Sequence, residues 1–231
     1  MLCVAAAACG GGGGGNNSNT TSYPFVVPAV GSQRNFSQTT VDNASNTVAE
    51  TYSDKILAVN SDGTFVAQTF DPSGTVIVVN GVTYSIPTRT TTVDPSGRDL
   101  SYTFVQNSGA VSCVDNPNGA GPTYPVSVGA AWSSTWTLTC NAAAGVAYQQ
   151  SGTIVDLESV TIPAGTFKAL KLQSTVTWTS VSGTTVTETI TRWRDSSNGQ
   201  GVKEVDAFAY SSPPATPAYT VSKTIELVGL Q

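Results

Sequence analysis

Short runs of alternating polar and apolar residues, separated by turn-forming residues, fill most of the chain after residue 22. Such runs cover residues 35–41, 47–59 and 64–70, with Asn, Asp, Ser and Gly between them. A period of two is typical of strands with one buried face, and no window shows the 3.6-residue period of a helix. Strands at intervals of roughly 8 to 12 residues are expected of a sandwich or barrel. The pattern predicts an all-β fold of antiparallel curved sheets, either an open barrel or a sandwich.

The same alternation predicts which face of a later run is buried. Trp132, Trp136 and Leu138 fall on one face, and serine and threonine residues occupy the other. An aromatic stripe of this kind could bind sugar rings or lipids, but core packing is the commoner role of such residues. Earlier in the chain, the dipeptide Asn80-Gly81 between two β-type runs predicts a two-residue hairpin.

The sharpest local pattern is the turn Pro163-Ala164-Gly165, which lies between two β-type runs. The second run continues to Trp178. Proline fixes φ and lacks an amide donor, whereas glycine tolerates a left-handed backbone, so the segment can bend sharply. We therefore predict that Pro163 and Gly165 form a structural turn that sets the register of two strands.

A weak internal similarity suggests how the domain is organised. The residues that follow Val30-Gly31 resemble those that follow Val128-Gly129. An internal repeat of this size would correspond to one β unit per copy. The all-β domain is predicted to cover residues 23–231, with two similar halves at 23–120 and 123–231.

Composition narrows the chemistry. Only 11% of the 231 residues are charged, the net charge is −5, and there are ten Lys and Arg residues. This balance argues against a nucleic-acid footprint. The chain has no histidine, which removes His-based triads and His metal sites. The repeated tetrapeptides that begin at Asp71 and Asp94 suggest calcium, but aspartate commonly caps such turns, and we favour capping. We expect no metal, no cofactor and no catalytic residues.

The amino-terminal residues have the composition of a targeting signal. Residues 1–8 are apolar and alanine-rich and precede Cys9, and residues 9–22 are rich in Gly and Asn. The run Ala6-Ala7-Ala8-Cys9 resembles the lipobox of bacterial lipoproteins, in which the signal is cleaved and the cysteine is lipidated. Residues 9–22 would then form a flexible tether. By the same resemblance, Gly10 implies an outer-membrane lipoprotein facing the periplasm or the cell surface. The alternative is an incidental alanine-rich tail with a free cysteine.

Two cysteines remain within the β domain, Cys113 and Cys140. In an exported protein, the oxidising compartment favours a disulfide between them. The alternative is two separate buried thiols. A metal site is a poor fit, because two sulfurs without histidine leave tetrahedral coordination incomplete.

Part of the second half resembles a known group of proteins. The segment from Val160 to Lys171, together with the segment from Tyr124 to Trp132 and the run Thr191-Arg192-Trp193, resembles an uncharacterised family of β-rich lipoproteins of Gram-negative bacteria. The resemblance covers about residues 123–205. It implies a curved antiparallel sheet or open barrel and an envelope location, and it carries no catalytic residues.

Three functions are compatible with these observations. The first is a non-enzymatic, lipid-anchored protein of the cell envelope, used for binding or structural support, with an envelope protein as a candidate partner. The second is a carrier of a hydrophobic ligand in a barrel-like cavity. The third is a glycan hydrolase that uses Asp156 and Glu158 as paired carboxylates, although strand alternation alone also places them on one face. Arg192 and Arg194 share a face with Glu188, where they could hold an anion or form cross-strand pairs.

Overall fold

A computed structural model describes residues 21–79, 82–106, 109–141, 143–212 and 219–231. Cys9 lies outside these residues. The described residues form fourteen β-strands. The strands are β1 (Gln33–Asp42), β2 (Thr47–Val59), β3 (Phe65–Phe70), β4 (Ile77–Val79), β5 (Val82–Tyr84), β6 (Arg89–Val93), β7 (Asp99–Gln106), β8 (Gly109–Asn116), β9 (Ala131–Cys140), β10 (Val146–Ile162), β11 (Gly165–Thr179), β12 (Thr185–Asp195), β13 (Gly201–Tyr210) and β14 (Thr220–Leu230). No helix in this part of the chain is long and apolar enough to cross a membrane.

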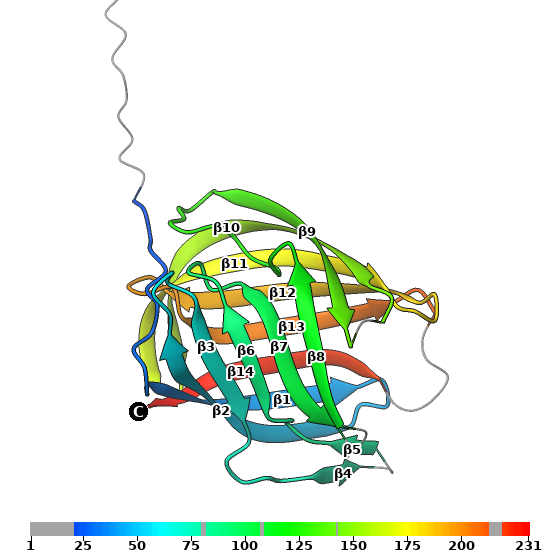
Figure 1. Ribbon diagram of the computed structural model, residues 1–231. Coiled ribbons are helices and arrows are strands. Elements are labelled where there is room, and N and C mark those ends of the chain that lie inside the picture. The colour runs from blue at the N-terminus through cyan, green and yellow to red at the C-terminus, as the bar shows by residue number, and fades with distance from the viewer. Residues whose placement is uncertain (1–20, 80–81, 107–108, 142, 213–218) are drawn as a thin grey trace, which may run out of the picture.

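Twelve of the strands form a closed antiparallel barrel in the order β1-β14-β13-β12-β11-β10-β9-β8-β7-β6-β3-β2. The barrel closes because β1 pairs with β14 on one side and with β2 on the other. In Figure 1, strands β3, β6, β7 and β8 cross one wall, and β11, β12 and β13 cross the wall behind it at a steep angle. The all-β prediction is confirmed, and the barrel is closed rather than open or split into a sandwich. Strands from both predicted halves belong to this one sheet.

The predicted hairpin beside the Asn80-Gly81 dipeptide is present outside the barrel. Strands β4 and β5 pair only with each other and form a separate two-stranded sheet. In Figure 1 this sheet lies beyond the end of the barrel opposite the C-terminus. The dipeptide itself lies outside the described residues.

Pro163 and Ala164 form the turn between β10 and β11, the two longest strands. Gly165 follows with a φ of 131°, which other residues rarely adopt. The Ala164 amide donates to the Leu227 carbonyl of β14 at 3.2 Å. Because of this contact, the tip of the hairpin bends across one end of the barrel and is held against a strand that is not its neighbour in the sheet.

Side-chain alternation gives the barrel an inward face and an outward face. On β11, Leu170, Leu172 and Val176 are almost completely buried and point inward. On β9, Trp136 is 9% exposed and lies on the inward face, which confirms its predicted core position. The tetrapeptide turns are capped as expected, since the Asp94 carboxylate accepts bonds from the amides of Ser96 and Arg98 at 2.8 and 2.9 Å.

A close contact between β9 and β10 allows this packing to be tested by substitution. Trp132 lies opposite Gly152, and a methyl group added at Gly152 would lie 2.3 Å from the Trp132 ring. Gly152→Ala is therefore expected to lower the free energy of unfolding by about 1 to 3 kcal/mol, the usual cost of overpacking. Gly201→Ala is the matched control, because nothing lies within 4 Å of its added methyl group. Urea denaturation would measure both, and equal stability of the two variants would contradict this packing.

Candidate functional site

The inside of the barrel carries charged side chains close to one end. On β12, Glu188, Arg192 and Arg194 share a face with Ile190, which is 7% exposed and points inward. Strand β12 therefore directs two arginines and a carboxyl group into the lumen, where apolar residues would normally fill a small barrel. Buried charges of this kind are costly unless they are paired.

Most of these charges are paired across neighbouring strands. The Arg192 guanidinium donates to the Glu204 carboxylate of β13. The Lys223 ammonium of β14 lies 3.9 Å from Glu204 Oε1 and 2.7 Å from Asp206 Oδ2. Asp206 is fully buried, and the Lys223 ammonium offsets part of the cost of burying its carboxylate. The four groups form a chain of alternating charge along the lumen wall.

Burial and neighbouring charges shift the pKa values of the three carboxyl groups on this wall in different directions. Burial raises the pKa of Glu204, but the charges of Arg192 and Lys223 outweigh it and lower the value to about 2. For Asp206, burial and then the charge of Glu204 raise the pKa to about 6. Burial and then the charge of Asp206 raise the pKa of Glu188 to about 7. At neutral pH the wall thus holds one firmly ionised carboxylate and two carboxyl groups that readily take up a proton.

Two arginines approach the same loop from the strands that flank β13 and β14 in the sheet, Arg34 from β1 and Arg194 from β12. Arg34 of β1 donates to the Gly201 carbonyl and Arg194 of β12 donates to the Gly199 carbonyl, both at 3.0 Å. Arg34 also lies 4.0 Å from Asp54 of β2. The loop that precedes β13 therefore fixes both guanidinium groups.

A cavity of about 280 Å³ lies between these arginines and the opposite wall of the barrel. Its charged lining consists of Arg34, Arg89, Arg192, Arg194 and Lys203 together with Asp54, Asp99 and Glu204. Its apolar lining includes Phe25, Phe36, Ile56, Phe65, Val93 and Ile225. Charged and apolar side chains alternate along the same strands, since Arg34 and Phe36 both lie on β1 and Asp54 and Ile56 both lie on β2, so the cavity offers both kinds of contact to a ligand.

The segment before β1 covers the end of this cavity. The amide of Val26 donates to the Asn198 carbonyl at 2.8 Å, and Phe25 packs with its ring centroid 6.2 Å from that of Phe65 and 5.6 Å from that of Tyr124. In Figure 1 this blue segment runs down the end of the barrel at which the C-terminus lies. The chain that leads in from the predicted tether therefore forms part of the cavity wall.

A second hollow of about 350 Å³ adjoins the first and shares Arg192, Arg194 and Asp99 with it. Its lining also includes Asp115 and Trp136. Burial and then the charge of Asp99 raise the pKa of Asp115 to about 6. The two hollows together give the lumen a polar path past the arginines.

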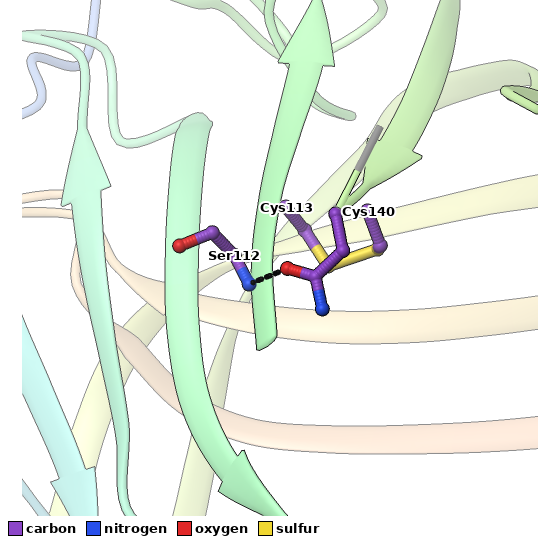
Figure 2. Close-up of a disulfide and its surroundings, with 4 residues drawn as sticks. Ser112, Cys113 and Cys140 are labelled. Atoms are coloured by element: carbon purple, nitrogen blue, oxygen red, sulfur yellow. Dashed lines mark hydrogen bonds between the residues drawn. A yellow bond between two sulfur atoms is a disulfide. The ribbon is translucent and has the colours of Figure 1, made fainter. Parts of the chain in front are cut away.

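The predicted disulfide is confirmed. Cys113 and Cys140 are bonded and face each other across β8 and β9 (Figure 2). Beside them, the Ser112 amide donates to the Asn141 side-chain oxygen at 2.8 Å. The pairing of β8 with β9 covers four residue pairs, so the disulfide closes a short seam of the barrel.

The predicted carboxylate pair does not lie in the lumen. Asp156 is opposite Lys171 on the outward face, and its carboxylate accepts the Leu157 amide at 2.7 Å. Glu158 accepts a bond from Trp193 Nε1 at 2.5 Å and lies 3.7 Å from Lys171. Both carboxylates are engaged outside the barrel, so the geometry does not assemble the two-carboxylate site of a glycan hydrolase there. Among the described residues, no group of three or more Cys, Asp or Glu residues is placed to hold a metal ion.

Sequence reasoning identified part of the lumen site and missed the rest. The shared face of Glu188, Arg192 and Arg194 was visible, and the cross-strand pairing of Arg192 is present. Arg34 and Asp54 carry no local signal, because their relation to Arg194 depends on closure of the barrel. The sequence signal for such a lumen site is a charged residue on the otherwise apolar face of an alternating strand.

Comparison with solved structures supports the fold. The barrel is similar to that of a protein from Bacteroides fragilis NCTC 9343, described as exported and as having a YmcC-like fold, with a TM-score of 0.53 and 13% identity over 91% of this chain and 100% of the other. At this identity the likeness shows a shared fold.

Two further structures align less closely. One, described as a lipoprotein, is from Parabacteroides distasonis ATCC 8503 and has a TM-score of 0.46 and 14% identity over 91% of this chain and 99% of the other. The other is the hypothetical lipoprotein YmcC from Escherichia coli K12, which has a TM-score of 0.43 and 11% identity over 84% of this chain and 86% of the other. No protein-family model matches the chain, and no curated protein matches it in sequence.

Proposed function

We propose that this protein is a non-enzymatic, lipid-anchored protein of the cell envelope that binds a small ligand inside its barrel. The observation that carries the proposal is the cavity of about 280 Å³ that is lined by both charged and apolar side chains. Ligand sites are typically concave and largely apolar, with a few convergent polar groups that orient the ligand. A barrel used only for support would gain stability from a lumen filled with apolar side chains.

The proposed location rests on the amino-terminal sequence. The lipobox-like run that ends at Cys9 and the Gly/Asn-rich tether would anchor the barrel to the outer membrane, facing the periplasm or the cell surface. The neighbour from Bacteroides fragilis is described as exported, which agrees with this location. Stable anchoring requires more than one acyl chain, which a lipidated amino-terminal cysteine can supply.

A purely hydrophobic ligand fits this cavity less well. Four arginines line it, and a ligand without polar groups would strip them of water without replacing their hydrogen bonds. The carrier hypothesis therefore becomes the binding of a ligand that is charged at one end.

Native mass spectrometry of the protein purified from its own membranes tests both parts of the proposal. The expected species begins at an acylated Cys9, contains the Cys113–Cys140 disulfide, and carries a small non-covalent ligand that is lost on denaturation. An intact, unmodified amino terminus would contradict the anchor. A barrel recovered without any adduct, and unable to take one up from a small-molecule extract of the same cells, would contradict the binding role.

A further inference from the structure

Arg194 is the unusual member of the cavity lining. Each of the three carboxylates in that lining pairs with a different arginine, namely Asp54 with Arg34, Asp99 with Arg89, and Glu204 with Arg192. Within the part of the chain that the structure describes, no carboxylate lies within 4.0 Å of Arg194. Among these described residues, Arg194 therefore carries a positive charge in the lumen that is not part of an ion pair.

The hydrogen bonds of Arg194 show the same deficit. One terminal nitrogen donates to the Gly199 carbonyl, whereas Nε is buried and has no hydrogen-bond partner among the described residues. The Tyr124 ring lies 5.9 Å from the guanidinium, and the Tyr124 side chain partly offsets the burial that lowers the pKa of Arg194. A buried donor without an acceptor is expensive, so such atoms in a ligand cavity suggest an acceptor that binds there.

Arg34 adds a second donor to the same place. The turn at Gly199 to Gly201 holds Arg34 and Arg194, and both line the cavity. Burial lowers the pKa of each guanidinium; the charge of Arg194 lowers that of Arg34 further, although Asp54 partly opposes this. An anion placed between the two guanidinium groups would relieve this repulsion.

The lining also narrows the kind of anion. The planar fork of a guanidinium matches the two oxygens of a carboxylate, and one unpaired positive charge calls for one negative charge. Phenylalanine and aliphatic side chains lie among the charged groups of the lining, and they suit an apolar body. A volume of about 280 Å³ limits that body to a small one.

We infer that Arg194, assisted by Arg34, binds the carboxylate of a small organic acid whose apolar part lies against Phe36 and Phe65. This inference rests on the proposed binding function and names the ligand class. The acid would enter as its anion, and binding forms hydrogen bonds and breaks no covalent bond.

Calorimetric titration of the purified full chain with sodium benzoate, and with uncharged benzamide, tests the inference. The two probes share one ring and differ in the charged group. Benzoate is expected to bind, and benzamide to bind at least about tenfold more weakly. Arg194→Gln should weaken benzoate binding by about 10- to 100-fold, which corresponds to the loss of a charge-assisted hydrogen bond. Lys55→Gln is the matched control, because it removes one positive charge from the exposed outward face of β2 and should leave binding unchanged.

Arg194→Lys keeps the charge and removes the fork, and it should bind benzoate with intermediate affinity, so that the test survives if the glutamine variant does not fold. Equal binding of benzoate and benzamide, or full benzoate affinity in Arg194→Gln, would overturn the carboxylate site while leaving a ligand-binding lumen intact. Binding of neither probe by the wild-type chain would overturn the carboxylate inference; if native mass spectrometry also finds no ligand, the proposed function fails with it.

Discussion

Replacing Cys113 and Cys140 together by serine is expected to lower the free energy of unfolding by about 3 to 4 kcal/mol, the value that chain entropy assigns to a loop of this length. The two residues are 27 apart in sequence and directly opposite in the β8–β9 pairing. That pairing spans four residue pairs, whereas β10 and β11 pair along fourteen. The disulfide should therefore stabilise the short β8–β9 pairing in the folded barrel, in addition to lowering the entropy of the unfolded chain. Urea denaturation of the oxidised protein and the variant measures the difference.

A neighbouring pair provides the control for that experiment. Val114 and Thr139 lie opposite each other in the same seam, and Val114 is 53% exposed on the outward face. Changing both to serine leaves the disulfide in place and should cost less than about 1 kcal/mol, as surface substitutions usually do. If the cysteine variant were no less stable than this control, the disulfide would have no part in holding the barrel closed.

The protein is expected to lose stability as the pH rises from about 5 to about 8, the opposite of acid denaturation. Burial and neighbouring negative charge raise the pKa of Glu188 to about 7, and those of Asp206 and Asp115 to about 6. In the unfolded chain these groups titrate near their ordinary values of about 4. Between the two values the folded state holds more protons than the unfolded state, so raising the pH favours unfolding.

Glu204 acts in the opposite direction at lower pH. Its pKa is lowered to about 2, so its contribution is present above its ordinary value of about 4.3 and is lost as the pH falls towards 2. Stability should therefore be greatest near pH 5. Thermal unfolding measured across this range should show a maximum of Tm there.

Glu188→Gln identifies the group responsible. Glutamine cannot ionise, so the variant should lose part of the decline in Tm between about pH 5 and pH 8. Asp206 and Glu204 of β13, Lys223 of β14, and Arg192 of its own strand remain to titrate or to set the local field. Glu226→Gln is the control, because Glu226 pairs with Lys203 at 2.7 Å on the outward face. A Tm that rises steadily to pH 8 in the wild-type protein would contradict the buried carboxyl groups as described.

Local pattern was enough to predict most of the strands. The run predicted at residues 47–59 is β2, and the alternation over residues 132–139 correctly placed Trp136 in the core. Both features depend on the period-two geometry of a strand, which the sequence displays directly. Closure of the barrel depends instead on pairing between β1 and β14, almost 200 residues apart, and no local signal reports such a pairing.

The site divides in the same way. Arg192 and Arg194 were seen to share a face, and two roles were open to them, anion binding and cross-strand pairing. The structure gives the second role to Arg192 through Glu204, and among the described residues no carboxylate forms an ion pair with Arg194. Arg34 reaches the same turn from 167 residues away, a contact that only the closed barrel creates. Asp156 and Glu158 were correctly placed on one face, but that face is the outer one.

The most direct test of a carboxylate site in the lumen is an NMR titration that follows the arginine Nε–H resonances of the full chain. Addition of benzoate should move the Arg194 resonance, whose Nε–H has no acceptor among the described residues, and should move that of Arg34 with the same concentration dependence. Benzamide at equal concentration should leave both in place. Benzoate shifts confined to outward-facing residues, with Arg194 unmoved at saturation, would contradict the account.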